Sequence, residues 1–104
     1  MVGLVILTTT PDLKSARRLA RVLVQKKLAA CVSLRGGFVS LYRWKGKLET
    51  SREVLLLIKT VRTKFSPVEK LIRATHPYEL PEIIGLPIVK GSADYLSWLN
   101  KLLR

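Results

Sequence analysis

The sequence contains very few of the side chains that form covalent cross-links or degrade readily at high temperature. Its 104 residues include one cysteine, Cys31, one asparagine, one glutamine and one methionine. A single cysteine excludes an intrachain disulfide, so a reducing, cytoplasmic location is expected. The scarcity of thermolabile side chains is typical of proteins from hot environments, and it predicts a thermostable protein.

Long apolar runs are also missing. No stretch approaches the ~20 apolar residues that a membrane-spanning helix needs. The N-terminal MVGLVIL lacks the basic start and the small-residue cleavage site of a signal peptide. Hydrophobic residues make up 48% of the chain and charged residues 25%, which is the balance of an ordered globular protein. We therefore expect one domain, residues 1–104, that makes no use of a membrane.

Acidic residues are scarce as well. Seven Asp and Glu stand against 19 Lys and Arg, which gives a net charge of +12. Such a charge attracts polyanions, nucleic acid included. The outward face of the first predicted helix carries Lys14, Arg17, Arg18 and Arg21, but no aromatic residue interrupts it to stack on bases. We therefore expect nonspecific nucleic-acid binding at low salt only.

Sequence motifs of the common enzyme classes are absent. The chain has no glycine-rich phosphate loop, no HExxH, no CxxC and no Ser-His-Asp set. We expect a protein that is not an enzyme and that requires no cofactor.

What the chain does contain is an alternation of strand and helix patterns. Runs of apolar and β-branched residues predict strands, and apolar residues at helical spacing predict helices. The resulting order, β-α-β-β-α-β with an added C-terminal helix, is the ferredoxin-like pattern of the α+β class. The predicted elements are a strand at 2–7, a helix from Pro11 to about Lys27, two strands within 28–60, a helix from Pro67 to Thr75, a strand at 81–88 and a helix from near Ser92. The predicted buried stripe of the first helix is Leu13, Ala16, Ala20, Leu23 and Val24.

Short-range signals set the ends of these elements. Thr10 and Ser66 are predicted N-caps, because proline follows each of them at the first helical position. Lys45-Gly46-Lys47 predicts a tight turn between two long hairpin arms that begin at Trp44 and Leu48. Arms of roughly a dozen residues exceed the usual ~5–6, so we expect the overhang to pair with another copy of the chain.

Two further positions constrain the strands. Gly36-Gly37 predicts a bulge or a bend in the first hairpin arm, because glycine weakens a strand without another gain there. Pro87 cannot donate a hydrogen bond to a neighbouring strand, so it is expected on an edge strand of the sheet or at a bulge.

Six segments, taken in this order, resemble the CutA family of divalent-ion tolerance proteins. They are TTTPD at 8–12, KLAACVSL at 27–34, SLYRWKGKLE at 40–49, EVLLLIKT at 53–60, THPYELPEI at 75–83 and DYLSWL at 94–99. The resemblance implies a ferredoxin-like protomer that assembles as a homotrimer through its long hairpin, with a fold akin to the PII signalling proteins. It also implies a role in tolerance to copper and other divalent cations, without an accepted reaction.

The chain departs from the copper-binding pattern of that family at two positions. Members regarded as copper binders can carry a cysteine where this chain has Thr8 and a second histidine where it has Thr75. Of that set only His76 remains, so weak copper(II) binding is the expectation.

His76 is the candidate metal ligand. Neutral imidazole suits copper(II) or zinc, and Glu79 or Glu82 could add oxygen ligands. The alternative is a rigid helix stop at His76-Pro77-Tyr78, with the imidazole bonded to backbone or to a neighbouring subunit. One histidine is too few for a closed metal site, and we expect the structural role to be the principal one.

A second candidate site is an inter-subunit cleft. We expect its lining to consist of Tyr42, Trp44, Lys59, Glu79, Glu82, Tyr95 and Trp98. In related folds such clefts hold small anions or nucleotides, so a PII-like sensor is the alternative function. The competing interpretation is that the aromatic residues are interface packing and that Lys59 pairs with Glu82 across a subunit boundary. Cys31, on an apolar strand, is expected in the core.

Overall fold

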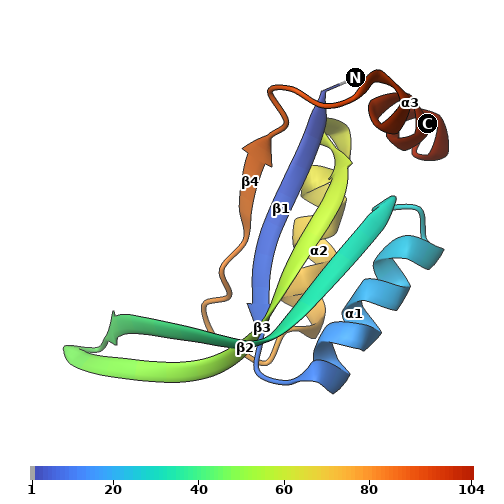
Figure 1. Cartoon of the computed structure of the whole chain (residues 1–104). Helices are drawn as coiled ribbons and strands as arrows, with labels where there is room; N and C mark the ends of the chain where they lie inside the picture. Colours follow the sequence, from blue (N-terminus) through green and yellow to red (C-terminus); the bar gives the residue numbers. More distant parts are fainter. Residues whose placement is uncertain (1) are drawn as a thin grey trace.

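The computed structural model describes residues 2–104. Its elements follow the predicted order along the chain (Figure 1). They are strand β1 (Gly3–Thr10), helix α1 (Leu13–Gln25), strands β2 (Cys31–Trp44) and β3 (Lys47–Val61), a 3₁₀ turn η1 (Arg62–Lys64), helix α2 (Phe65–Thr75), strand β4 (Ile84–Pro87) and helix α3 (Ala93–Leu102).

The four strands form one antiparallel sheet in the order β2-β3-β1-β4. In Figure 1, α1 lies beside β2, α2 lies behind the sheet, and α3 sits at the end where the chain begins. The fold is therefore mixed α+β, with β1 in the interior of the sheet and β2 and β4 at its edges. Pro87 belongs to edge strand β4, as predicted, although that strand is only four residues long.

The main core lies between one face of the sheet and helices α1 and α2. Side chains alternate along the strands, so every second residue of β1 and β3 faces the helices. The strands contribute Leu4, Ile6, Val54, Leu56 and Ile58, and the helices contribute Ala16, Leu19, Leu23, Val68 and Ile72. A smaller cluster of Ala30, Val61, Leu99 and Leu103 holds α3 against the sheet.

The hairpin of β2 and β3 extends beyond this core. In Figure 1 its outer half swings away below β1 and β4, and the molecule measures 44 × 25 × 23 Å. Lys45 (φ 51°) and Gly46 (φ 80°) form a two-residue turn in which Trp44 pairs with Lys47. The second arm therefore begins at Lys47, one residue before the predicted Leu48. The register shifts between Arg35 and Phe38, which confirms the bulge predicted at Gly36-Gly37.

Helix α1 begins later than predicted. Its N-cap is Asp12, whose carboxylate accepts a hydrogen bond from the Ser15 amide at 2.7 Å. Thr10 instead stays in β1, where its hydroxyl donates to the Asp12 carbonyl. Aspartate and threonine are both good caps, so the sequence offers two candidate N-caps that are two residues apart.

The other helix predictions also needed correction. Helix α2 begins at Phe65 after the 3₁₀ turn and has no side-chain cap, so Ser66 lies inside it. In α1, Leu13 and Val24 remain 44% and 43% exposed, and the buried side includes Leu19, which was not predicted. Ser92 caps α3 as expected, through its hydroxyl oxygen and the Tyr95 amide.

Candidate functional site

The segment THPYELPEI forms the turn that ends α2. The His76 amide donates the last helical hydrogen bond, to the Ile72 carbonyl at 2.8 Å, and Pro77 prevents the helix from continuing. His76 itself has extended backbone angles (φ −78°, ψ 135°). The chain therefore turns at the histidine and runs back toward β4.

The imidazole of His76 is held by backbone on both sides. Its Nε2 lies 2.6 Å from the carbonyl oxygen of Thr9, and its Nδ1 accepts a hydrogen bond from the Tyr78 amide at 3.0 Å. A carbonyl oxygen can only accept and an amide can only donate, so Nε2 is the donor nitrogen of this arrangement and Nδ1 the acceptor. This arrangement joins the turn to the end of β1, and it matches the structural role predicted for His76.

Tyr78 continues the network to a buried carboxylate. Its hydroxyl donates to Glu53 Oε2 at 2.9 Å, and the Thr9 hydroxyl donates to the same oxygen at 3.2 Å. Glu53 is only 7% exposed. Burial, followed by the hydrogen bond to Glu53 and its negative charge, raises the pKa of Tyr78 to about 12, so the phenol stays a donor at neutral pH.

Sequence reasoning missed Glu53. It occupies the start of the apolar run EVLLLI in β3, where residues alternate between the core and the opposite face of the sheet. A single acidic residue at the start of an apolar strand is the sequence signal that could have identified Glu53. Its two hydroxyl donors come from β1 and from the turn after α2, and the sequence does not place those segments next to β3.

A groove of about 800 Å³ lies between the overhanging hairpin and the turn after α2. The structure brings four residues of the predicted cleft to this groove, namely Tyr42, Trp44, Glu79 and Glu82, together with Glu53 and Tyr78. Phe38, Val39, Leu41 and Leu80 add apolar surface. Tyr42 also exchanges a hydrogen bond with Ser51 of the neighbouring strand, with 2.9 Å between the hydroxyl oxygens.

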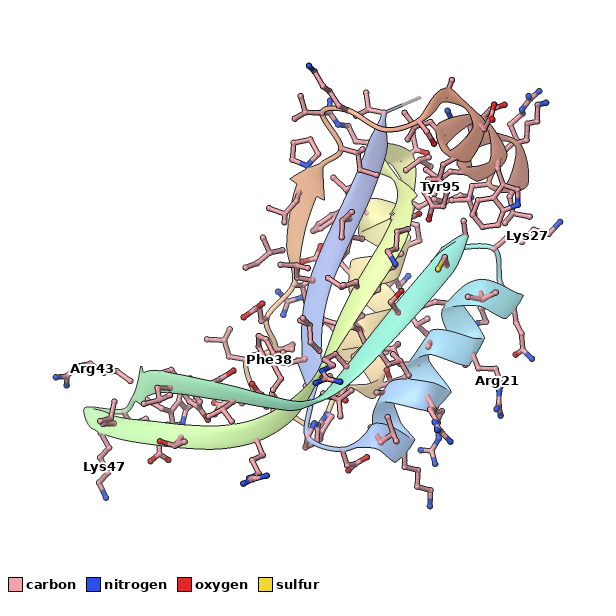
Figure 2. The ribbon with its side chains drawn as sticks, viewed as in Figure 1. Arg21, Lys27, Phe38, Arg43, Lys47 and Tyr95 are labelled. Carbon is pink, nitrogen blue, oxygen red and sulfur yellow. The ribbon has the colours of Figure 1, made fainter. Side chains whose placement is uncertain are left out.

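The remaining predicted cleft residues lie at the other end of the protomer. Lys59 Nζ donates to Ser33 Oγ at 2.5 Å and lies 3.9 Å from Cys31 Sγ. Tyr95 and Trp98 of α3 stack with ring centroids 5.6 Å apart. Burial, and then the charge of Cys31, raise the pKa of Tyr95 above that of a free phenol. Figure 2 shows Tyr95 on α3, which in this view lies above the start of β2.

Strand geometry explains this separation. Glu53, at the groove, and Lys59 are six residues apart in β3, or ~20 Å at about 3.4 Å per residue. One protomer therefore contains two groups of candidate residues. Cys31 is only partly buried, so the expectation that it belongs to the core was wrong.

The metal-ligating side chains of residues 2–104 form no group of three that could hold an ion. His76 has both ring nitrogens engaged, and a copper ion on Nδ1 would have to displace the Tyr78 amide. Within one protomer, then, these residues do not fit a closed copper or zinc site, which needs three or four ligands.

Comparisons of sequence and of structure with known proteins all point to the same family. The family described as CutA1 divalent ion tolerance protein matches residues 4–102. A divalent-cation tolerance protein CutA from Thermus thermophilus is 43% identical over 97 residues, which is 93% of this chain and 94% of the relative. The crystal structure of CutA from Xylella fastidiosa superposes with a TM-score of 0.94 at 45% identity and covers 98% of both chains.

A plant relative differs in length. The chloroplastic CutA of Arabidopsis thaliana is 42% identical over 102 residues. The match covers 98% of this chain but only 56% of that protein. None of the helices within residues 2–104 is both long enough and apolar enough to cross a membrane.

Proposed function

Because the chain belongs to the CutA1 divalent ion tolerance family, we propose that it contributes to tolerance of divalent cations, copper included. We propose that it does so in the cytoplasm, as one domain of residues 1–104 and without enzymatic activity. The observation that carries the proposal is the family match over residues 4–102. A source strain lacking the gene is expected to stop growing at a lower copper(II) concentration than its parent, and the restored gene is expected to reverse this. Equal growth of all three strains would contradict the proposal.

We further propose that His76 binds copper(II) only weakly. The two backbone hydrogen bonds of the ring support this, because a metal gains one nitrogen ligand only after one of them breaks. Calorimetric titration with copper(II) and zinc should give weak, sub-stoichiometric heats for wild type that decrease further in His76→Ala, with Cys31→Ser as the matched control that keeps the wild-type heats. Stoichiometric micromolar binding that disappears only in His76→Ala would make the histidine a true ligand.

The working unit is proposed to be a homotrimer of ferredoxin-like protomers. Both sheet edges, β2 and β4, lack a strand partner among residues 2–104, and unpaired edges favour association. Large apolar side chains are also exposed on these two strands, on β3 near the hairpin turn and in the turn after α2, namely Val39, Leu41, Ile84, Leu86, Leu48 and Leu80. Light scattering is expected to give three times the 11.7 kDa of one chain.

The second candidate function is a PII-like sensor that binds a small anion between subunits. The ammonium of Lys59 supports it. This group is half-buried, its neighbours are a hydroxyl and a thiol, and no carboxylate of residues 2–104 forms an ion pair with it. An unpaired, partly buried cation favours an anionic ligand.

A thermal-shift screen of nucleotides and small anionic metabolites tests the sensor function. A true ligand raises the melting temperature further as its concentration increases, and Lys59→Gln should abolish that rise. Lys90→Gln, which removes an exposed cation elsewhere, is the matched control. If no compound raised the melting temperature with increasing concentration, the sensor function would be contradicted and divalent-cation tolerance would be the sole proposal.

A further inference from the structure

The solvent-facing side of α1 is a strip of positive charge. Lys14, Arg17, Arg18 and Arg21 recur at three- and four-residue intervals, so they share one face of the helix. The opposite face, with Ala16, Leu19 and Leu23, is packed into the core. Between the four cations, Leu13 and Val22 lies a shallow hollow of about 480 Å³. Figure 2 shows Arg21 and Lys27 extending from the α1 side, far from Arg43 and Lys47 on the hairpin.

Little negative charge balances this strip. The sequence contains no acidic residue between Asp12 and Glu49. Within residues 2–104 the one ion pair joins Arg73 to Glu69 on α2, so none of the four cations is paired. Asp12 lies near Lys14 and Arg18, but its carboxylate is occupied as the N-cap, and its pKa is lowered chiefly by the hydrogen bond from Ser15. The strip is therefore available to an external anion.

The chemistry of the strip favours a nucleic-acid backbone over a lipid surface. An interfacial helix must insert a free apolar face into the membrane, whereas the apolar face of α1 is buried beneath the sheet. Three of the four cations are arginine, whose guanidinium matches phosphate with two parallel hydrogen bonds. No aromatic residue lies in α1 to stack on a base.

We propose that the α1 strip binds the phosphate backbone of duplex nucleic acid without reading its sequence. The four cations span ~10 Å along the helix, because Lys14 and Arg21 are seven residues apart at 1.5 Å per residue. The phosphates of one strand recur about every 3.4 Å along a duplex. The strip can thus contact several neighbouring phosphates at once. This function is separate from divalent-cation tolerance and does not depend on it.

The test is the salt dependence of binding to a fluorescein-labelled 20-base-pair DNA duplex of arbitrary sequence, followed by fluorescence anisotropy. With four phosphate contacts, the affinity of wild type should fall about 150-fold between 50 and 200 mM NaCl, since each contact adds ~0.9 to the logarithmic slope. The triple variant Lys14→Gln/Arg17→Gln/Arg21→Gln keeps one contact, so its affinity should fall only about 3.5-fold over the same range.

A matched control separates the strip from net charge. The variant Lys90→Gln/Lys101→Gln/Arg104→Gln removes the same three charges from exposed positions outside α1, and it should keep the wild-type salt slope. Equal losses of duplex affinity and of salt dependence in the two triple variants would overturn the proposal, because net charge alone would then explain binding. Tighter binding to phosphatidylserine vesicles than to the duplex, or a tenfold preference between two unrelated duplex sequences, would overturn it too.

Discussion

At the scale of single residues, the buried carboxylate of Glu53 is stabilised by hydrogen bonds from its neighbours. It is nearly buried, and its Oε2 accepts hydrogen bonds from Tyr78 and Thr9. Tyr78→Phe removes one of the two donors and leaves a buried charge less well satisfied, which should lower the free energy of unfolding by about 1–3 kcal/mol. Urea denaturation measures this change.

Tyr42→Phe is the matched control for that substitution. It also removes a tyrosine hydroxyl from a hydrogen bond, but the partner is Ser51 at an exposed position. Water can replace the lost partner there, so the effect should stay below about 1 kcal/mol. Equal losses in the two variants would mean that the Glu53 network adds no special stability.

The same tyrosine predicts a pH dependence. The pKa of Tyr78 is about 12 in the folded protein against 10.0 for a free phenol. Because the folded pKa is the higher one, its stabilising effect is fully present below pH 10 and is lost as the pH rises toward 12. Wild type should therefore lose more stability than Tyr78→Phe between pH 10 and 12 in denaturation experiments. If the free energy of unfolding fell equally with pH in the two proteins, the raised pKa of Tyr78 would be contradicted.

Among the secondary-structure elements, the bulge in β2 depends on one of its two glycines. Gly37 has a φ of +72°, whereas Gly36 is not in the left-handed region, and a Cβ added at either position would meet no atom within 4 Å. Gly37→Ala should cost about 1–2 kcal/mol, because left-handed backbone disfavours a side chain. Gly36→Ala should change the free energy of unfolding by less than about 0.5 kcal/mol. The difference, measured by thermal denaturation, isolates backbone strain from packing.

The sequence predicted the order of the elements better than their ends. Apolar periodicity and glycine or proline at turns act locally, so the hairpin, the bulge and the stop at His76 could be predicted. Helix starts were less certain, because Thr10 and Asp12 compete as caps and α2 starts without one. Side-chain preference near a helix start is worth only ~1 kcal/mol, and tertiary packing readily overrides it.

The candidate site was predicted in part. Tyr42, Trp44, Glu79 and Glu82 do line one groove, because the hairpin and the turn after α2 lie side by side. Lys59 lies elsewhere, since six residues of extended strand carry it ~20 Å away. Distances along a strand follow from sequence numbers once its bounds are known, whereas contacts between distant segments do not.

At the scale of the whole molecule, the hairpin should control assembly. Leu41 and Leu48 on its arms are 66% and 70% exposed. Leu41→Glu/Leu48→Glu should convert the proposed trimer into monomers, because charged side chains disfavour an apolar interface. Light scattering would then give 11.7 kDa, and the melting temperature should fall. Val24→Glu on α1 is the control, and it should remain trimeric. A trimeric hairpin variant would place the interface elsewhere.

The position of β1 in the sheet has a consequence for biosynthesis. This strand is synthesised before both of its neighbours in the sheet, because β3 and β4 come later in the chain. At 5–20 residues per second, about 3–10 s pass between the synthesis of Thr10 and that of Val61. For that interval the nascent chain presents an apolar strand without its final partners, which makes it a natural client for chaperones that bind extended apolar segments.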